Sequence, residues 1–193
     1  RKKYFFSISK NICGESHISK IDKVLKSLKK LKADSIFISA PENVAWLLNI
    51  RGHDNPNSPI PNCHLLLDVK KKIYLIADKV KTKKLVLEKK LTQKQIIDFK
   101  EFDSFLEKYP NKKMIIDRKT CSLFYENLLK KRLNFYKKDD PIYMFKAIKN
   151  KIEISNMIKA HISDGAALTK FIFWIKNINK KKITEYDAQN KLE

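Results

Sequence analysis

The sequence predicts an α/β fold, with a mixed sheet flanked by helices, followed by the first helices of a second domain that is cut short. Short β-rich runs alternate with amphipathic helical patterns up to about residue 140, which is typical of a sheet covered by helices. Two runs, 64–69 and 73–77, are separated only by three lysines and therefore predict a hairpin of antiparallel strands. Beyond Pro141 the alternation stops and one long helical pattern begins.

Two helices and a strand are expected in the first fifty residues. Residues 1–13 have the pattern of an extended lead-in, and Ser16 or Ser19 then caps a helix of about 14 residues. The run 35–39 has the composition of a strand, and Pro41 suits the first turn of a second helix. The apolar stripe of the first helix is Ile18, Ile21, Leu25 and Leu28.

A loop is predicted at 52–62, which holds one of the three glycines and three of the six prolines. Loops held by prolines often lie at functional sites. Shorter elements are expected between the hairpin and Pro141. They are a helix at 79–87, a strand at 95–99, a helix at 101–109, a strand at 114–117, a helix capped by Thr120 that runs through Leu128, and a strand at 134–136.

The long helix is predicted over 151–177, with an apolar residue at every third or fourth position. Residues 179–182 interrupt it. Thr184, with Asp187 three residues later, resembles a capping box that opens another helix. Two helices without a core of their own predict the start of another domain. The stripe consists of Ile154, Ile158, Ile162, Gly165, Leu168, Ile172 and Ile175.

The net charge of +21 comes almost wholly from lysine, since only four of the 42 basic residues are arginines. Lysines spread along the chain predict solvated faces, and the shortage of arginine disfavours a nucleic-acid site. No apolar run reaches the roughly 18 to 20 residues of a membrane span, and no cleavage site follows the basic start. Three widely spaced cysteines predict a reducing, cytoplasmic compartment. A zinc site from His53, Cys63 and His64 does not match the usual ligand spacings.

Five stretches of the chain carry recognisable motifs. They are Gly14-Glu15-Ser16, AWLLNIRGHD at 45–54 with Pro56 and Pro59 behind it, AIKN at 147–150 with Glu153, AHISDGAAL at 160–168, and TEYDA at 184–188. In this order they resemble the Xaa-Pro aminopeptidases, metallopeptidases of the creatinase-like, pita-bread family. The resemblance extends over about residues 5–193.

The resemblance implies the long, three-domain form of that family. Residues 1–10 would end the linker from a preceding domain, residues 11–145 would form the middle, creatinase N-terminal-like α/β domain, and residues 146–193 would begin the peptidase domain. The family removes the N-terminal residue from peptides with proline in the second position. This segment is therefore expected to have a structural and substrate-gating role and to be inactive alone. Family members often dimerise, so a homodimer is a possible assembly.

The resemblance also implies where the chemistry lies. The family binds two divalent metals, usually Mn²⁺, through two Asp, one His and two Glu of the peptidase domain, and the metals activate a water molecule. None of those motifs occurs in this chain, so we expect no catalytic residue, no metal and no cofactor in this segment. His161 and Asp164, one helical turn apart, are expected to be structural, Trp46 to lie in the core, and His17 to face solvent.

Arg51, His53 and Asp54 form the segment that we expect closest to the substrate. Gly52 permits a tight or left-handed turn, across which Arg51 and Asp54 can pair as guanidinium and carboxylate. Bracing of the loop is the simpler interpretation. The functional interpretation is that the loop faces the mouth of the catalytic cleft, where either charged group can bind a peptide terminus once the peptidase domain completes the site.

Two other classes of function remain open. One is a protein-binding module related to pita-bread enzymes but without catalysis, although a charge of +21 is poorly suited to a basic partner. The other is a lysine-rich nucleic-acid-binding domain, which the charge alone suggests. From the resemblance, we expect the full-length protein to bind peptides with proline in the second position, and we expect it to bind neither nucleic acid nor a membrane.

Overall fold

The computed structural model describes residues 3–110, 113–178 and 183–192. The chain divides into two compact units, Arg1–Lys149 and Asn150–Glu193, and each unit is described by itself. The predicted break at 179–182 lies outside the described residues.

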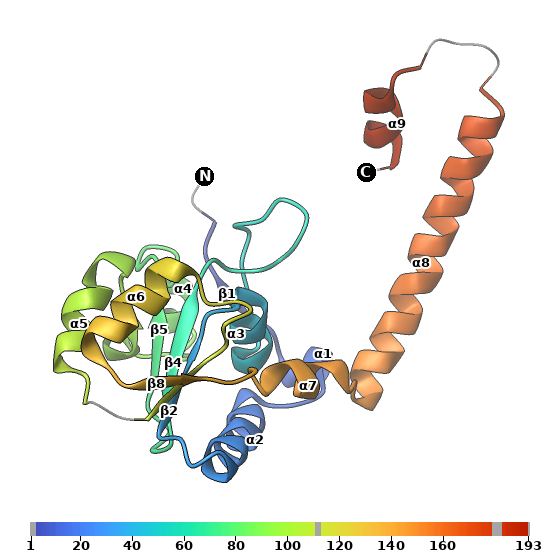
Figure 1. Ribbon diagram of the computed structural model, residues 1–193. Coiled ribbons are helices and arrows are strands. Elements are labelled where there is room, and N and C mark those ends of the chain that lie inside the picture. Colours follow the sequence, from blue (N-terminus) through green and yellow to red (C-terminus); the bar gives the residue numbers. More distant parts are fainter. Residues whose placement is uncertain (1–2, 111–112, 179–182, 193) are drawn as a thin grey trace. The chain divides into compact units, whose positions relative to one another are not determined.

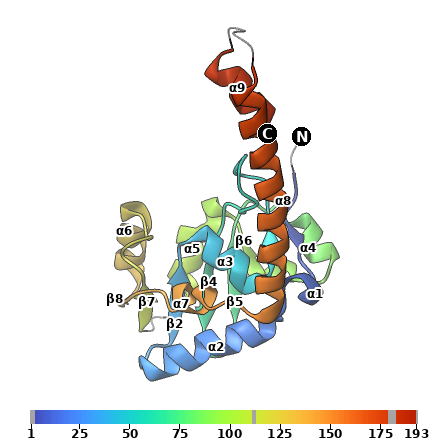
Figure 2. The ribbon, with the colours of Figure 1, turned by 90° about the vertical axis from the view of Figure 1, so that its right-hand side faces the viewer.

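The sheet of the first unit consists of six short strands, β2 (Ser35–Ile38), β4 (His64–Asp68), β5 (Ile73–Ile76), β6 (Ile96–Ile97), β7 (Met114–Ile116) and β8 (Phe135–Lys137). They lie in the order β6-β5-β4-β2-β7-β8; Figure 1 shows the sheet within the first unit, and Figure 2 labels all six strands. β4 is antiparallel to its neighbours β2 and β5, whereas the β2–β7, β7–β8 and β5–β6 pairs are parallel. The predicted mixed sheet and its hairpin are therefore confirmed.

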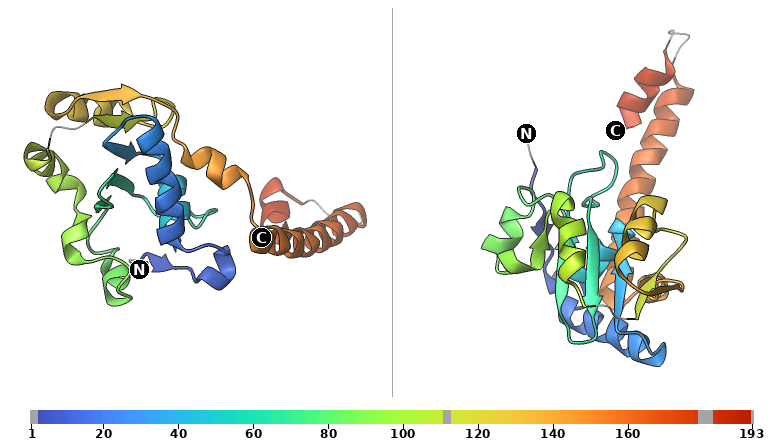
Figure 3. Two further views of the ribbon diagram at one scale, coloured as in Figure 1. Left: turned by 90° about the horizontal axis from the view of Figure 1, so that it is seen from below. Right: turned by 60° about the vertical axis from the view of Figure 1, so that its left-hand side comes forward.

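Four helices cover the two faces of this sheet, α2 (His17–Lys30) and α3 (Pro41–Leu48) on one face and α5 (Phe102–Lys108) and α6 (Leu123–Arg132) on the other. Figure 2 looks onto the layer of α2 and α3, and the left view of Figure 3 shows the strands between α2 and α5. Ile36 and Ile38 of β2 enter the first core and Phe37 enters the second. This division follows from strand geometry, because successive side chains point to opposite faces.

The caps predicted for α2 and α3 explain where these helices begin. The Ser16 hydroxyl accepts the Ser19 N–H at 3.2 Å, and Pro41 occupies the first turn of α3. α2 buries Ile21, Val24, Leu25 and Leu28, but Ile18 from the predicted stripe is 59% exposed. Ile18 lies at the N-terminal end of the helix, beyond the part of α2 that packs on the core.

Three predicted elements differ in detail. The helix expected at 79–87 is only α4 (Lys83–Leu87), and the strand expected at 95–99 is reduced to β6, between two 3₁₀ turns at 93–95 and 99–101. Thr120 does not cap α6. Its hydroxyl lies 2.7 Å from the Ser39 hydroxyl at the end of β2, and Ser122 accepts the Tyr125 N–H instead. A long-range contact therefore engages Thr120 and leaves the capping role to Ser122.

The extended lead-in expected at 1–13 contains the short strand β1 (Phe6–Ser7), but its end is the helical turn α1 (Lys10–Cys13). Two further short elements, β3 (Ile50–Arg51) and α7 (Ile142–Ala147), had no sequence signal that we recognised. α7 is fastened to the start of α3 by Asn43, whose amide donates to Asp140 Oδ2 at 2.9 Å and whose Oδ1 accepts the Lys146 ammonium at 2.7 Å. Burial of Asp140 raises the pKa of its carboxyl.

The second unit consists of α8 (Lys151–Lys176) and α9 (Glu185–Leu192). The predicted capping box is present at α9, where Thr184 pairs with Asp187. A second box, which the sequence analysis did not predict, opens α8, where Asn150 and Glu153 satisfy one another's backbone N–H groups. No residue of α8 is buried, and Ile162 from its apolar stripe is 67% exposed. None of the helices in the described ranges is long and apolar enough to cross a membrane.

Candidate functional site

The loop that follows β3 is positioned by the end of α3. Asn49 terminates α3 in the left-handed conformation, with φ at 52°, and the chain reverses into β3. β3 then pairs antiparallel with β1, so that Phe6 lies opposite Arg51 and Ser7 opposite Ile50. This two-stranded ribbon carries Arg51 to the start of the loop at 52–62.

A buried lysine, which the sequence analysis did not single out, holds this reversal in place. Lys20 of α2 is 1% exposed, and its ammonium donates to Asn49 Oδ1 at 2.8 Å and to the Trp46 carbonyl at 3.0 Å. The ammonium also lies 4.2 Å from the centre of the Trp46 ring. Trp46 packs against the core, in agreement with the structural role predicted for it.

The Asn49 side chain connects two of the recognised motifs. Its amide donates to the Glu15 carbonyl at 2.8 Å, so the Gly14-Glu15-Ser16 stretch contacts the end of the AWLLN helix. The Glu15 carboxylate accepts the Lys23 ammonium and the Ser19 hydroxyl. These two motifs lie far apart in sequence but form one contact network at the base of the loop.

Gly52 is required by close packing and not by a left-handed turn. Among the described glycines only Gly14 has a positive φ. A Cβ atom on Gly52 would lie 2.7 Å from Pro61 Cα and 3.1 Å from Phe5 Cδ1, which is closer than carbon atoms approach one another. The Gly52 N–H donates to the Pro59 carbonyl at 3.1 Å, so the loop folds back on its own first residue.

The ion pair expected between Arg51 and Asp54 does not form within the part of the chain that the structure describes. The Arg51 guanidinium donates to the carbonyls of Ile50 at 2.8 Å and Ala45 at 3.4 Å, at the end of α3. Burial lowers the pKa of this half-buried guanidinium. Arg51 therefore braces the turn after α3 through backbone oxygens, which local sequence spacing does not reveal.

Asp54 closes the loop from the other side. One carboxylate oxygen accepts the Asn62 N–H at 2.7 Å, and the other binds the Lys81 ammonium. The Lys81 carbonyl in turn accepts the Phe5 N–H at 2.8 Å. Asp54 thus joins both ends of the loop to the segment before α4.

His53 is the exposed member of the predicted trio. Its ring stacks on Phe6 of β1, with the ring centres 5.4 Å apart. Beside it the loop forms an open recess of about 280 Å³. The recess is lined by Pro41, Asp54, Asn55, Ile60, Pro61 and Asn62. The structure therefore brings Arg51, His53 and Asp54 into one braced loop, with the imidazole exposed and the Asp54 carboxylate only 15% exposed and engaged by Lys81 and Asn62.

The other titratable residues considered for chemistry are packed inside the first unit or belong to the second unit. Cys63 is buried in the first core, and its burial raises the pKa of the thiol. His64 lies between aromatic rings with Nδ1 2.8 Å from the Ser39 carbonyl, and burial lowers the pKa of its imidazole. His161 and Asp164 are exposed on α8.

His17 does not face solvent as expected. It is half-buried at the start of α2, and both that burial and the charge of Lys90 lower its pKa. Across residues 3–110, 113–178 and 183–192, no three His, Cys, Asp or Glu side chains gather in a way that could hold a metal ion.

Comparison with known proteins places these observations in a family. The creatinase/prolidase N-terminal domain family matches residues 1–153. Xaa-Pro aminopeptidase 1 of Dictyostelium discoideum is 30% identical over 197 residues, which cover 100% of this chain and 31% of that protein. A probable Xaa-Pro aminopeptidase P of Aspergillus fumigatus is 31% identical over 93% of this chain and 29% of its own length.

Solved structures agree with the fold. The X-prolyl aminopeptidase of Caenorhabditis elegans, described as a cytosolic enzyme with a di-nuclear active site, superposes with a TM-score of 0.82 at 20% identity, over 98% of this chain and 32% of that one. The prolidase of Pyrococcus furiosus gives 0.60 at 26% identity, over 88% of this chain and 46% of that one. The chain spans about a third of the length of the curated relatives that it matches. By its motifs, its fold and these matches, the chain belongs to the creatinase/prolidase N-terminal domain family and is homologous to the N-terminal region of Xaa-Pro aminopeptidases.

Proposed function

We propose that this chain is the non-catalytic part of a cytoplasmic Xaa-Pro aminopeptidase, which removes the N-terminal residue from peptides with proline second. The main support is the match to the Dictyostelium enzyme across 100% of the chain at 30% identity. In this proposal residues 1–10 are a linker, 11–145 the middle domain and 146–193 the start of the peptidase domain. A cytosolic relative supports the compartment.

The metal chemistry belongs to the catalytic domain in this proposal. The C. elegans relative is described as having a di-nuclear active site, and two divalent ions, usually Mn²⁺, would activate water there. The residues described here supply no ligand cluster. In this proposal the present chain helps to control how the peptide reaches the catalytic domain, whether the protein is a homodimer or a monomer.

The loop with Arg51, His53 and Asp54 is the substrate-proximal surface in this proposal. Arg51 and Asp54 are engaged in bracing it, by two carbonyls and by Lys81 and Asn62. His53 is exposed and stacked on Phe6, so it is free to contact a peptide without disturbing the brace. The three residues therefore have different roles, and His53 is the one whose loss should affect substrate more than folding.

The test is made in the full-length protein with Mn²⁺ and short peptides that carry either proline or alanine second. Cleavage confined to the proline peptide supports the assignment, and absence of cleavage by folded, metal-loaded protein contradicts it. His53→Ala should lower kcat/KM by about tenfold with unchanged thermal stability. Ile18→Ala, on an exposed site of α2, is the matched control and should change neither. An unchanged kcat/KM in His53→Ala would leave the loop with a bracing role only.

A further inference from the structure

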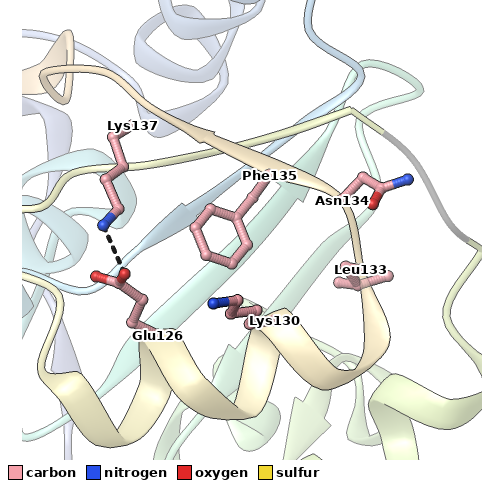
Figure 4. Close-up of a pocket in the computed structure, with 6 residues that line it drawn as sticks. All are labelled: Glu126, Lys130, Leu133, Asn134, Phe135 and Lys137. Atoms are coloured by element: carbon pink, nitrogen blue, oxygen red, sulfur yellow. Dashed lines mark ion pairs between the residues drawn. The ribbon is translucent and has the colours of Figure 1, made fainter.

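An open groove runs between α6 and β8, at the edge of the sheet away from the loop described above. It has a volume of about 470 Å³. Figure 4 shows Glu126 and Lys130 projecting from α6, and Phe135 and Lys137 reaching from β8 toward them. The Glu126 carboxylate pairs with the Lys137 ammonium at 2.5 Å. Leu133 and Asn134 complete the lining.

One wall of this groove is the free edge of the sheet, because β8 is the last strand in the order. The Asn134 carbonyl accepts the Met114 N–H, and the Lys138 N–H donates to the Ile116 carbonyl. In a parallel pair, backbone groups alternate between the two sides of a strand. The N–H and C=O groups of Phe135 and Lys137 therefore point outward, where another strand can bind them.

The charge along this edge is unbalanced toward the cationic side. A second recess of about 410 Å³ adjoins the groove through Lys137, which lines both. The two carboxylates that line this second recess already have partners within the chain. Asp139 pairs with the Lys119 ammonium, and Asp117 accepts the backbone N–H groups of Lys119 and Asp140. Within the described residues, no ion pair compensates three of the lining cations. These are Arg118, Lys130 and Lys138.

We propose that this edge groove binds an extended acidic polypeptide segment as an added strand beside β8. The outward backbone groups of Phe135 and Lys137 would supply hydrogen bonds, the Phe135 ring an apolar floor, and the uncompensated cations a match for carboxylates. A second copy of this chain is a poor occupant, because its net charge is also +21. The proposal does not depend on the peptidase assignment.

The test uses the 193-residue chain and a fluorescent synthetic peptide that alternates glutamate and valine, followed by anisotropy. Two further peptides carry N-methyl groups on every second residue, one along each edge of the strand. Methylation of the edge that faces β8 should weaken binding by about tenfold, the loss expected for two backbone hydrogen bonds, and methylation of the other edge should not. Peptide binding should slow hydrogen exchange at the amides of Phe135 and Lys137.

The matched charge variants separate this site from general attraction to a basic protein. Lys130→Gln/Lys138→Gln should weaken binding by about tenfold, whereas Lys26→Gln/Lys29→Gln on the exposed side of α2 removes the same charge and should change it less than about twofold. Equal loss in both variants, or equal affinity of both methylated peptides, would overturn the proposal. Sedimentation with phosphatidylserine vesicles that depends on Lys130 and Lys138, without peptide binding, would also overturn it and identify a lipid-facing surface.

Discussion

Lys20 offers the sharpest test of how the candidate loop is held. Methionine keeps most of the apolar stem of lysine but removes the ammonium. Lys20→Met would leave Asn49 Oδ1, in a residue that is 4% exposed, without this donor, whereas the Trp46 carbonyl would keep the Asn49 N–H at 3.4 Å. One buried acceptor without a partner costs about 1–3 kcal/mol, and this cost is partly offset because a cation is no longer buried away from water.

We expect Lys20→Met to lower the free energy of unfolding of the first unit by about 1–2 kcal/mol, the cost of the unpaired acceptor less the offset. This corresponds to a fall in Tm of about 2–8 °C for a unit of this size. The measurement is urea unfolding of the 193-residue chain, with Lys26→Met at an exposed position of α2 as the matched control. The control should change stability by less than about 0.5 kcal/mol.

A double-mutant cycle tests whether Lys20 acts through Asn49. Asn49→Gly preserves the left-handed conformation at this position and removes the acceptor. The double variant should then be more stable than the sum of the single changes predicts by about 1 kcal/mol. If Lys20→Met is as stable as the wild-type chain, the cost of burying the ammonium equals its hydrogen bonds, and the reasoning about the loop is refuted.

Three further predictions concern other parts of the chain. Gly52→Ala should destabilise it by about 1–3 kcal/mol, because the new Cβ meets Pro61 at 2.7 Å; an unchanged urea midpoint would show that the loop can shift. Burial lowers the pKa of His64 in the folded chain, so below about pH 6.5 the unfolded chain binds more protons than the folded chain does. The free energy of unfolding therefore decreases as the pH is lowered below about 6.5. The stability difference between wild type and His64→Gln should therefore narrow from about pH 7 to about pH 5, and a constant difference would contradict the burial argument. Ile162→Ser, at a residue that is 67% exposed, should change stability in urea by less than about 0.5 kcal/mol; a larger loss would mean that something covers this face in solution.

The elements that the sequence predicted well are those defined by neighbours a few residues apart. The Ser16 cap, Pro41 in the first turn of α3 and the box at Thr184–Asp187 are all contacts within one helical turn. The β4–β5 hairpin likewise needs only a short turn between two apolar runs. For such elements the local sequence contains both partners of the interaction.

The candidate loop shows where this local information ends. The motif 45–54 identified the segment, but it did not identify the partners that hold it. Arg51 binds backbone carbonyls, and Asp54 binds Lys81, 27 residues away in the sequence. The requirement for glycine at position 52 also differs from the expected one. A side chain at this position would clash with Pro61, which packs against it across the folded loop.

The sequence by itself determined the α/β class, the order of the main elements and the family to which the motifs belong. Only the tertiary structure decided that Lys20 is buried beneath the loop, that β1 pairs with β3, and that Thr120 binds Ser39 and caps no helix. The physical reason is the distance along the chain between partners. A buried polar group must find a hydrogen-bond partner wherever packing places one, and packing joins residues that no local pattern relates.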